Sequence, residues 1–118
     1  QWDLLRAIDP AWSDGPDPAR DAVEMAAGPD ADAAVTARWD QWRLPPDARA
    51  IVLHVSAGNP FRRWPEAAFA DVITALVRQS PDRWVLVTSG PSDQDAASRV
   101  VEQARGAAGD RATRVIEA

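Results

Sequence analysis

Apolar positions in the second half of the chain follow two spacings in turn, one typical of strands and one of helices. Residues 51–55 are a short continuous run of β-favouring residues, as expected for a strand covered on both faces, and residues 84–88 are expected to form a second strand. Between them, Pro65 and Glu66 open a stretch whose apolar side chains recur at helical spacing: Phe69, Val72, Ile73, Leu76 and Val77. The pattern therefore predicts a strand, a helix with one buried face that ends near residues 80–82, and a second strand.

The chain then repeats this alternation. Ser92 followed by Asp95 fits a capping box at the start of a second helix. The predicted inner face of that helix consists of Ala97, Val100, Val101 and Ala104. Gly106 and Gly109 are expected to end it, and residues 113–116 to begin a third strand. The order β-α-β-α-β with short connections predicts the α/β class and a partial Rossmann-like domain, with a parallel sheet and right-handed crossovers.

Residues 1–49 differ from the rest in pattern and in charge. The first 50 residues contain ten Asp and Glu against five Arg, so the whole net charge of −5 lies there. Two helices are expected, a short one around residues 4–8 and one over about residues 31–43 that is capped by Asp30. One side of the second helix consists of Val35, Trp39 and Trp42. We therefore predict a helical linker before a compact domain over residues 50–118.

Composition narrows the function classes. The 118 residues contain no Cys and a single His, which excludes disulfides, thiolate zinc sites, a cysteine nucleophile and a His-based metal cluster. With 13 basic against 18 acidic residues, the charge balance is opposite to that of a non-specific nucleic-acid or anionic-membrane binder. No apolar run approaches the roughly 18 residues of a membrane span. We therefore expect a soluble, cytoplasmic protein that binds no nucleic acid.

Residue usage also bears on the source and extent of the chain. Every basic residue is Arg, and Ala is abundant, as in proteins encoded by high-GC bacterial genomes. The chain begins at Gln1, and Met25 is its only methionine. We therefore expect a piece of a longer bacterial protein.

Two predicted loops contain the residues best suited to bind a ligand. In open parallel sheets, ligands bind beyond the carboxyl ends of the strands, beside helix N-termini. The first such loop, residues 56–65, contains Ser56, Ala57, Gly58, Arg62 and Arg63. The second, residues 88–93, contains Gly90 and Asp93. Because small residues let a phosphate approach the backbone, the two loops together can cradle a diphosphate and hydrogen-bond a ribose.

The same residues resemble motifs of glycosyltransferase family 9, the ADP-heptose:lipopolysaccharide heptosyltransferases. That family has a small-residue loop, a lysine-x-tryptophan-proline element and a glycine-glycine-proline-x-glutamate element at this spacing, here residues 55–58, 62–65 and 89–93. The resemblance implies a GT-B fold, with this chain as the first half of the C-terminal, donor-binding domain. It also implies that Arg62 takes the place of the lysine that neutralises the donor diphosphate, and that Asp93 contacts the nucleoside.

The resemblance further implies that the whole enzyme moves a sugar, expected to be a heptose, from a nucleotide-diphosphate donor to a lipopolysaccharide-type or other glycan acceptor. Ser56, Ala57, Gly58 and Gly90 would face the diphosphate without a metal or other cofactor. Two departures stand out: Val55 and Ser56 replace proline-glycine, and Ser89 replaces a glycine. The catalytic base is expected outside this chain, which alone should therefore not catalyse transfer. A second copy docked on the open sheet edge is a further expected partner.

Each candidate residue also has a purely structural interpretation. Arg62 and Arg63 can pair with surface acids, and Asp93 in a first helical turn can simply stabilise the helix dipole. Arg63 is interpreted as a solvated neighbour, His54 as a hydrogen-bonded core histidine, and Trp64 as a packing anchor of the loop. Two functional alternatives stay open: a non-catalytic α/β module that binds proteins, and another Rossmann-like nucleotide binder.

Overall fold

The computed structural model describes residues 4, 7–9, 17, 25–57 and 59–118. Contacts within the chain divide it into two units, Gln1–Val35 and Thr36–Ala118. In the first unit, residues 4, 7 and 8 are helical, in agreement with the short helix expected there, while residue 5 lies outside the described residues. Helix α2 (Pro29–Gln41) begins in the first unit and ends in the second. The predicted division of the chain at residues 49 and 50 stays a prediction.

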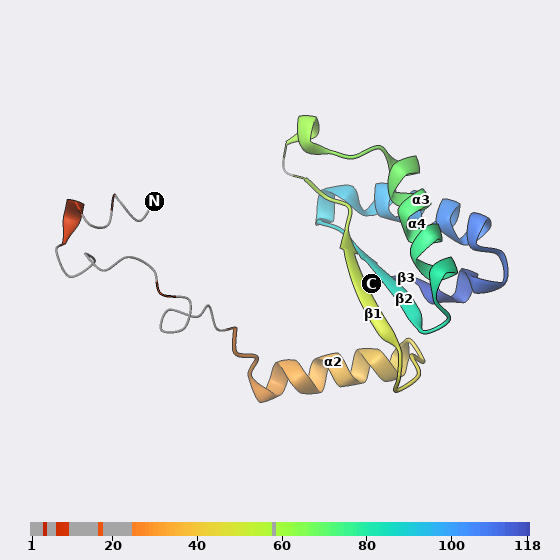
Figure 1. Ribbon diagram of the computed structural model, residues 1–118, viewed down its shortest axis with the longest axis horizontal. Coiled ribbons are helices and arrows are strands. Elements are labelled where there is room, and N and C mark those ends of the chain that lie inside the picture. Colours follow the sequence, from red (N-terminus) through yellow and green to blue (C-terminus); the bar gives the residue numbers. More distant parts are fainter. Residues whose placement is uncertain (1–3, 5–6, 10–16, 18–24, 58) are drawn as a thin grey trace. The chain divides into compact units, whose positions relative to one another are not determined.

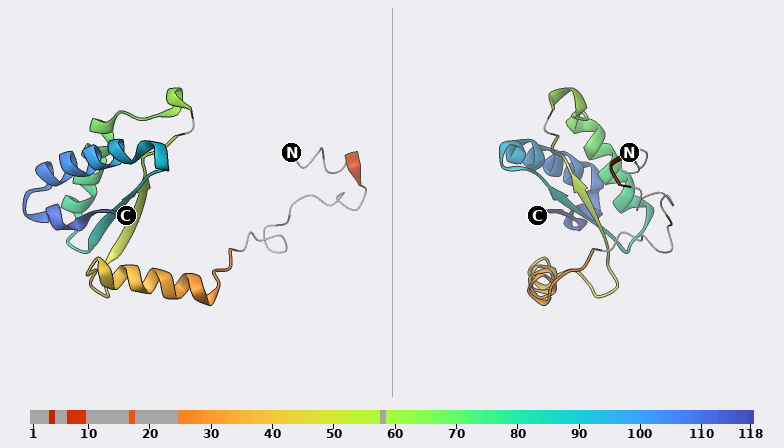
Figure 2. Two further views of the ribbon diagram at one scale, coloured as in Figure 1. Left: turned by 180° about the vertical axis from the view of Figure 1, so that it is seen from behind. Right: turned by 90° about the vertical axis from the view of Figure 1, so that its left-hand side faces the viewer.

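Three parallel strands form the centre of the second unit (Figure 1). Strands β1 (Arg49–His54), β2 (Arg83–Thr88) and β3 (Val115–Glu117) lie in the order β1-β2-β3. Helix α3 (Glu66–Gln79) connects β1 to β2, and α4 (Gln94–Ala108) connects β2 to β3. Both helices lie on one side of the sheet, as the views of Figure 2 show. The predicted α/β class and the order β-α-β-α-β of a partial Rossmann-like fold are confirmed.

The main core lies between the sheet and helices α3 and α4. Its completely buried side chains are Ile73, Val77, Val85, Val87, Val100, Ala104 and Val115. Full burial of one Val or Ile side chain stabilises the fold by roughly 1.5–3 kcal/mol, so this layer holds β2 and β3 against the helices. Strand β1 contributes the partly buried Ile51 and Leu53. The inner face predicted for α4 is confirmed, because Ala97 and Val101 are buried as well.

On the opposite face of the sheet, side chains of β2 and β3 are buried, whereas those of β1 are exposed. A second apolar cluster there consists of Leu44, Leu86 and Ile116, with Trp39, Trp42, Ala48 and Trp84 packed against it. Val52 of β1 is 65% exposed, and His54 is exposed too. The prediction that β1 is covered on both faces is therefore wrong, and so is the core position predicted for His54. Its Nδ1 lies 3.0 Å from the Thr88 hydroxyl.

The helix starts differ from the predicted ones in their caps. Helix α2 begins at Pro29, so Asp30 lies in the first turn and not at the predicted capping position, and Val35 is exposed. The capping box predicted for α4 is wrong as well. This helix begins at Gln94 without a side-chain cap, and the Ser92 hydroxyl donates to the Asp93 carboxylate at 3.3 Å.

The end of α4 also lies further along the chain than predicted. Gly106 is inside the helix, and Gly109 ends it with a positive φ of 64°, a conformation that glycine adopts without strain. A 3-10 segment, η4 (Gly109–Arg114), follows, so the third strand begins at Val115 and not at residue 113. This segment sets the start of β3.

Candidate functional site

The two predicted ligand loops meet at the carboxyl ends of β1 and β2. The Ser56 hydroxyl oxygen accepts a hydrogen bond from the Gly90 N–H at 2.6 Å. The strand register explains this meeting, because His54 pairs with Thr88 and Ser56 lies opposite Gly90 two residues further on. A Cβ on residue 90 would lie 3.4 Å from the Ser56 oxygen, in van der Waals contact, so the two loops approach each other closely here. The sheet thus brings together two of the predicted site residues.

An ion pair joins the same two loops a second time. Nη2 of Arg63 lies 2.9 Å from Oδ1 of Asp93, and Nε of Arg63 donates to the Ala57 carbonyl at 3.3 Å. The Asp93 side chain is only 8% exposed, whereas that of Arg63 is 47% exposed. Arg63 thus pairs with an acid, as its structural interpretation allows, while its side chain stays half-exposed. We call the contacts among Ala57, Arg63 and Asp93 the inter-loop bridge.

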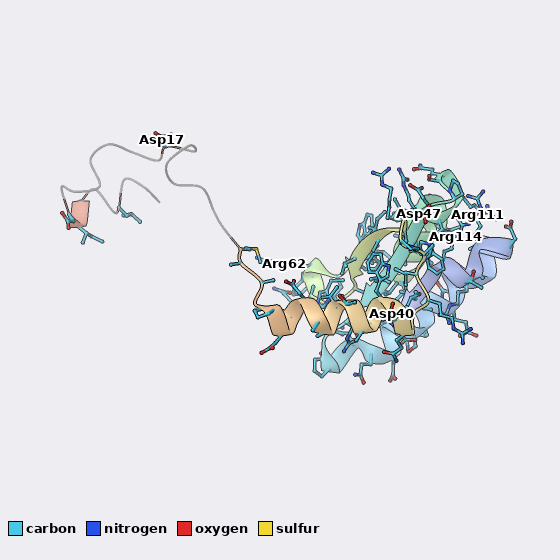
Figure 3. The ribbon with its side chains drawn as sticks, turned by 90° about the horizontal axis from the view of Figure 1, so that it is seen from below. Asp17, Asp40, Asp47, Arg62, Arg111 and Arg114 are labelled. Atoms are coloured by element: carbon cyan, nitrogen blue, oxygen red, sulfur yellow. The ribbon has the colours of Figure 1, made fainter. Side chains whose placement is uncertain are left out.

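Arg62 lies at the end of η2 (Pro60–Arg62), a 3-10 turn held by Asn59. The Asn59 carbonyl accepts from the Arg62 N–H at 2.9 Å, and the Asn59 side-chain oxygen accepts from the Phe61 N–H at 2.9 Å. The Arg62 side chain is exposed (Figure 3), and within the described part of the chain its guanidinium has neither a hydrogen bond nor an ion pair. Phe61 beside it is 98% exposed. The turn therefore holds a cation and an aromatic ring in solvent.

Glu66, in the first turn of α3, forms its ion pair with Arg99 of α4 and not with a residue of the two loops. Both of its carboxylate oxygens accept from Arg99, at 2.8 and 3.0 Å, and this hydrogen bonding holds the pKa of Glu66 below its ordinary value of 4.5. Trp64 is 55% exposed, and its ring meets that of Phe69 edge to face at 5.5 Å, which supports its interpretation as a packing anchor.

These positions decide which of the predicted site residues lie together. Ser56, Ala57, Gly90 and Asp93 lie in one network, Arg62 lies beside it, and Gly58 lies outside the described residues. Sequence reasoning missed the inter-loop bridge. Its signal was the opposite charge of Arg63 and Asp93 on loops that the parallel order brings together. Among the described residues, no group of three or more His, Cys, Asp or Glu is placed to hold a metal ion.

Such a network can bind an anion without a metal. The exposed guanidinium of Arg62 can form a two-pronged contact with phosphate oxygens, and the loop backbone between the strand and α3 can donate N–H groups. None of the helices in the described ranges is both long and apolar enough to cross a bilayer. Comparison with protein-family models, with curated proteins and with solved structures gave no match.

Proposed function

We propose that this chain contributes the donor half-site of a bacterial glycosyltransferase similar to family 9, in which residues 56–64 and 89–93 hold the diphosphate of a nucleotide sugar. The observation that supports it most is the exposed Arg62 guanidinium, which no acid of the described chain neutralises, beside two loops joined by the Ser56–Gly90 hydrogen bond. An exposed cation beside strand ends and a helix start is an arrangement that favours binding of a diphosphate.

In sugar transfer the chain's own residues would act on the leaving group. As the bond between the sugar and the diphosphate breaks, negative charge grows on the departing phosphate oxygens. A cation in contact with those oxygens in the transition state lowers the barrier more than it strengthens ground-state binding. Arg62 supplies this cation, and the loop backbone orients the phosphates. Deprotonation of the acceptor hydroxyl needs a base from outside this chain, so the chain alone binds the donor without transferring the sugar.

The test is a titration of the full 118-residue chain with ADP, GDP and UDP, followed by amide NMR shifts. The proposal expects shifts confined to residues 56–64 and 89–93 and a preference for one base. Arg62→Ala should raise the Kd about tenfold, the effect of losing one charge-assisted hydrogen bond. Arg49→Ala is the matched control, because Arg49 is equally charged but lies at the amino end of β1. The absence of shifts at millimolar nucleotide would contradict the proposal.

Phe61 favours a second candidate, the non-catalytic module that binds proteins. A ring that is 98% exposed on a turn ordered by Asn59 offers a partner a large apolar contact at low entropic cost. A substitution of Phe61 distinguishes the two candidate functions. Phe61→Ser should leave nucleotide-induced shifts unchanged under the glycosyltransferase proposal, and it should abolish partner binding under the alternative.

A further inference from the structure

We propose that Arg63 and Asp93 are positioning residues: the inter-loop bridge sets the distance between the two ligand loops, and Asp93 acts through Arg63 without touching a bound nucleotide. The effect on ligand affinity rests on the proposed function, whereas the effect on the loops themselves does not. This role differs from the nucleoside contact that the family resemblance implies for Asp93.

The surroundings of Asp93 support this role. Its side chain is 8% exposed, and both carboxylate oxygens have partners, Oδ1 with Arg63 at 2.9 Å and Oδ2 with the Ser92 hydroxyl at 3.3 Å. Asp93 also stands at the N-cap position of α4, where a carboxylate ordinarily accepts from the helix backbone, yet it caps nothing. The carboxylate is therefore committed to the other loop and leaves little surface to a ribose.

Arg63 joins parts of the chain that are distant in sequence. One guanidinium nitrogen donates to Ala57 on its own loop, and another meets Asp93 on the second loop. The Ser56–Gly90 hydrogen bond joins the same loops nearby. Two such contacts fix the loops relative to each other more tightly than one, and a site ordered in advance loses less entropy when its ligand binds.

The two neighbouring arginines consequently have different tasks. Asp93 neutralises Arg63, so that the loop offers an incoming anion mainly the charge of Arg62. Substitution of Arg63 should therefore change the loops before any ligand is present, whereas substitution of Arg62 should change only ligand binding. This difference makes the proposal testable with variants of identical charge change.

The experiment measures two quantities on the full chain: hydrogen exchange of the Gly90 amide without ligand, and the Kd for ADP. Arg63→Ala should speed Gly90 exchange about tenfold, because the loops separate and expose the bond to Ser56. It should also raise the Kd about tenfold. Arg62→Ala should raise the Kd and leave Gly90 exchange unchanged. Asp93→Asn should speed Gly90 exchange as Arg63→Ala does, but it should raise the Kd less, because Arg63 then keeps its charge without a neutralising partner. The double variant should bind ADP no more weakly than Arg63→Ala does.

Arg63→Lys is a control for misfolding of Arg63→Ala, since it keeps the charge but cannot span Ala57 and Asp93 with one planar group. It should give intermediate exchange at Gly90. Unchanged Gly90 exchange in Arg63→Ala and Arg63→Lys would overturn the proposal. A further rise of the Kd when Asp93→Asn is added to Arg63→Ala would overturn it as well, because it would mean that Asp93 touches the nucleotide. If the unsubstituted chain binds no ADP but Gly90 exchange responds as expected, the proposed function fails and the positioning role stands.

Discussion

Arginine side chains have different roles at the two edges of this α/β unit. Where α3 and α4 finish, Nη2 of Arg78 donates to the Ala107 carbonyl at 2.6 Å, so that α3 supplies a cation to the end of α4. Nη1 of Arg111 donates to the carbonyls of Val77 and Arg78 at 2.9 and 2.6 Å and does the same for α3. Where the strands finish, Arg63 joins two loops while Arg62 stays in solvent, far from Arg111 in Figure 3.

The comparison teaches that residue type alone does not mark a site. At the helix ends, each guanidinium satisfies carbonyls that have no partner within their own helix and lies at the negative end of a dipole. The arginines at the helix ends therefore stabilise the fold. At the strand ends, Arg63 joins the two loops, and Arg62 is the residue that would contact an external anion under the proposed function. Substitutions at both edges test this division.

The largest loss of stability is expected at the helix ends. Arg111→Ala removes two hydrogen bonds from a charged donor to the last carbonyls of α3 and should lower the free energy of unfolding by about 2 kcal/mol. Urea denaturation followed by circular dichroism measures it. Arg49→Ala serves as control, because this exposed side chain lies 3.8 Å from Asp82 and should contribute less than about 0.5 kcal/mol. Equal losses in both variants would contradict the assignment.

A smaller loss is expected at the inter-loop bridge. Asp93→Ala should cost about 1 kcal/mol, because solvent around the half-exposed Arg63 screens the ion pair. Thermal unfolding should then show a Tm lower by about 4–8 °C. Asp95→Ala, which removes an exposed acid from the first turn of α4, should shift the Tm less. A larger shift for Asp95→Ala would mean that the helix dipole, and not the bridge, dominates at this position.

The contact between Glu66 and Arg99 makes the free energy of unfolding depend on pH, and this effect is expected to be smaller still. Hydrogen bonding from Arg99 lowers the pKa of Glu66 in the folded state, so the contact stabilises the fold fully above the ordinary value of 4.5. That contribution is lost as the pH falls through the lower, folded-state pKa. Glu66→Gln should therefore reduce the loss of stability between neutral pH and pH values below 4.5, measured by urea denaturation. An unchanged pH profile would show that the contact contributes nothing.

The smallest effect on stability is expected for Arg62→Ala. No bond within the described chain holds this exposed guanidinium, so the free energy of unfolding should change by less than about 0.5 kcal/mol. The same urea experiment with Arg63→Ala gives the comparison, since the two substitutions remove the same charge one residue apart. Destabilisation by Arg62→Ala equal to that by Arg63→Ala would erase the distinction between the two arginines.

The helical spacing of apolar residues was the most informative part of the sequence. It placed Ile73 and Val77 on the buried face of α3, where the structure has them. It missed Thr74, which is buried because its hydroxyl donates to the Ala70 carbonyl at 2.7 Å and so needs no water. Hydropathy alone cannot report such a bond. The run at residues 51–55 misled for another reason, since burial of Val52 depends on whether the second apolar cluster extends over β1.

The position of the candidate site could be predicted from the sequence, but the contacts between its residues could not. The parallel order alone brings Ser56 and Gly90 to one edge, and both loops were identified from their small residues. Which of Arg62 and Arg63 pairs with Asp93 was not predictable, because neighbouring residues on an irregular turn can point in either direction. In the structure Arg63 contacts Ala57 and Asp93, whereas Arg62 is exposed.

The offset of the sheet register also bears on how the site assembles during folding. Arg49 pairs with Arg83 and His54 with Thr88, an offset of 34 residues that the Ser56–Gly90 hydrogen bond shares. One loop closure of that length therefore forms both the first strand pairing and the meeting of the two loops. Pairing of Val85 with Val115 is a separate closure. A nascent chain can thus join the two loops once β1, α3 and β2 have docked, before β3 is in place.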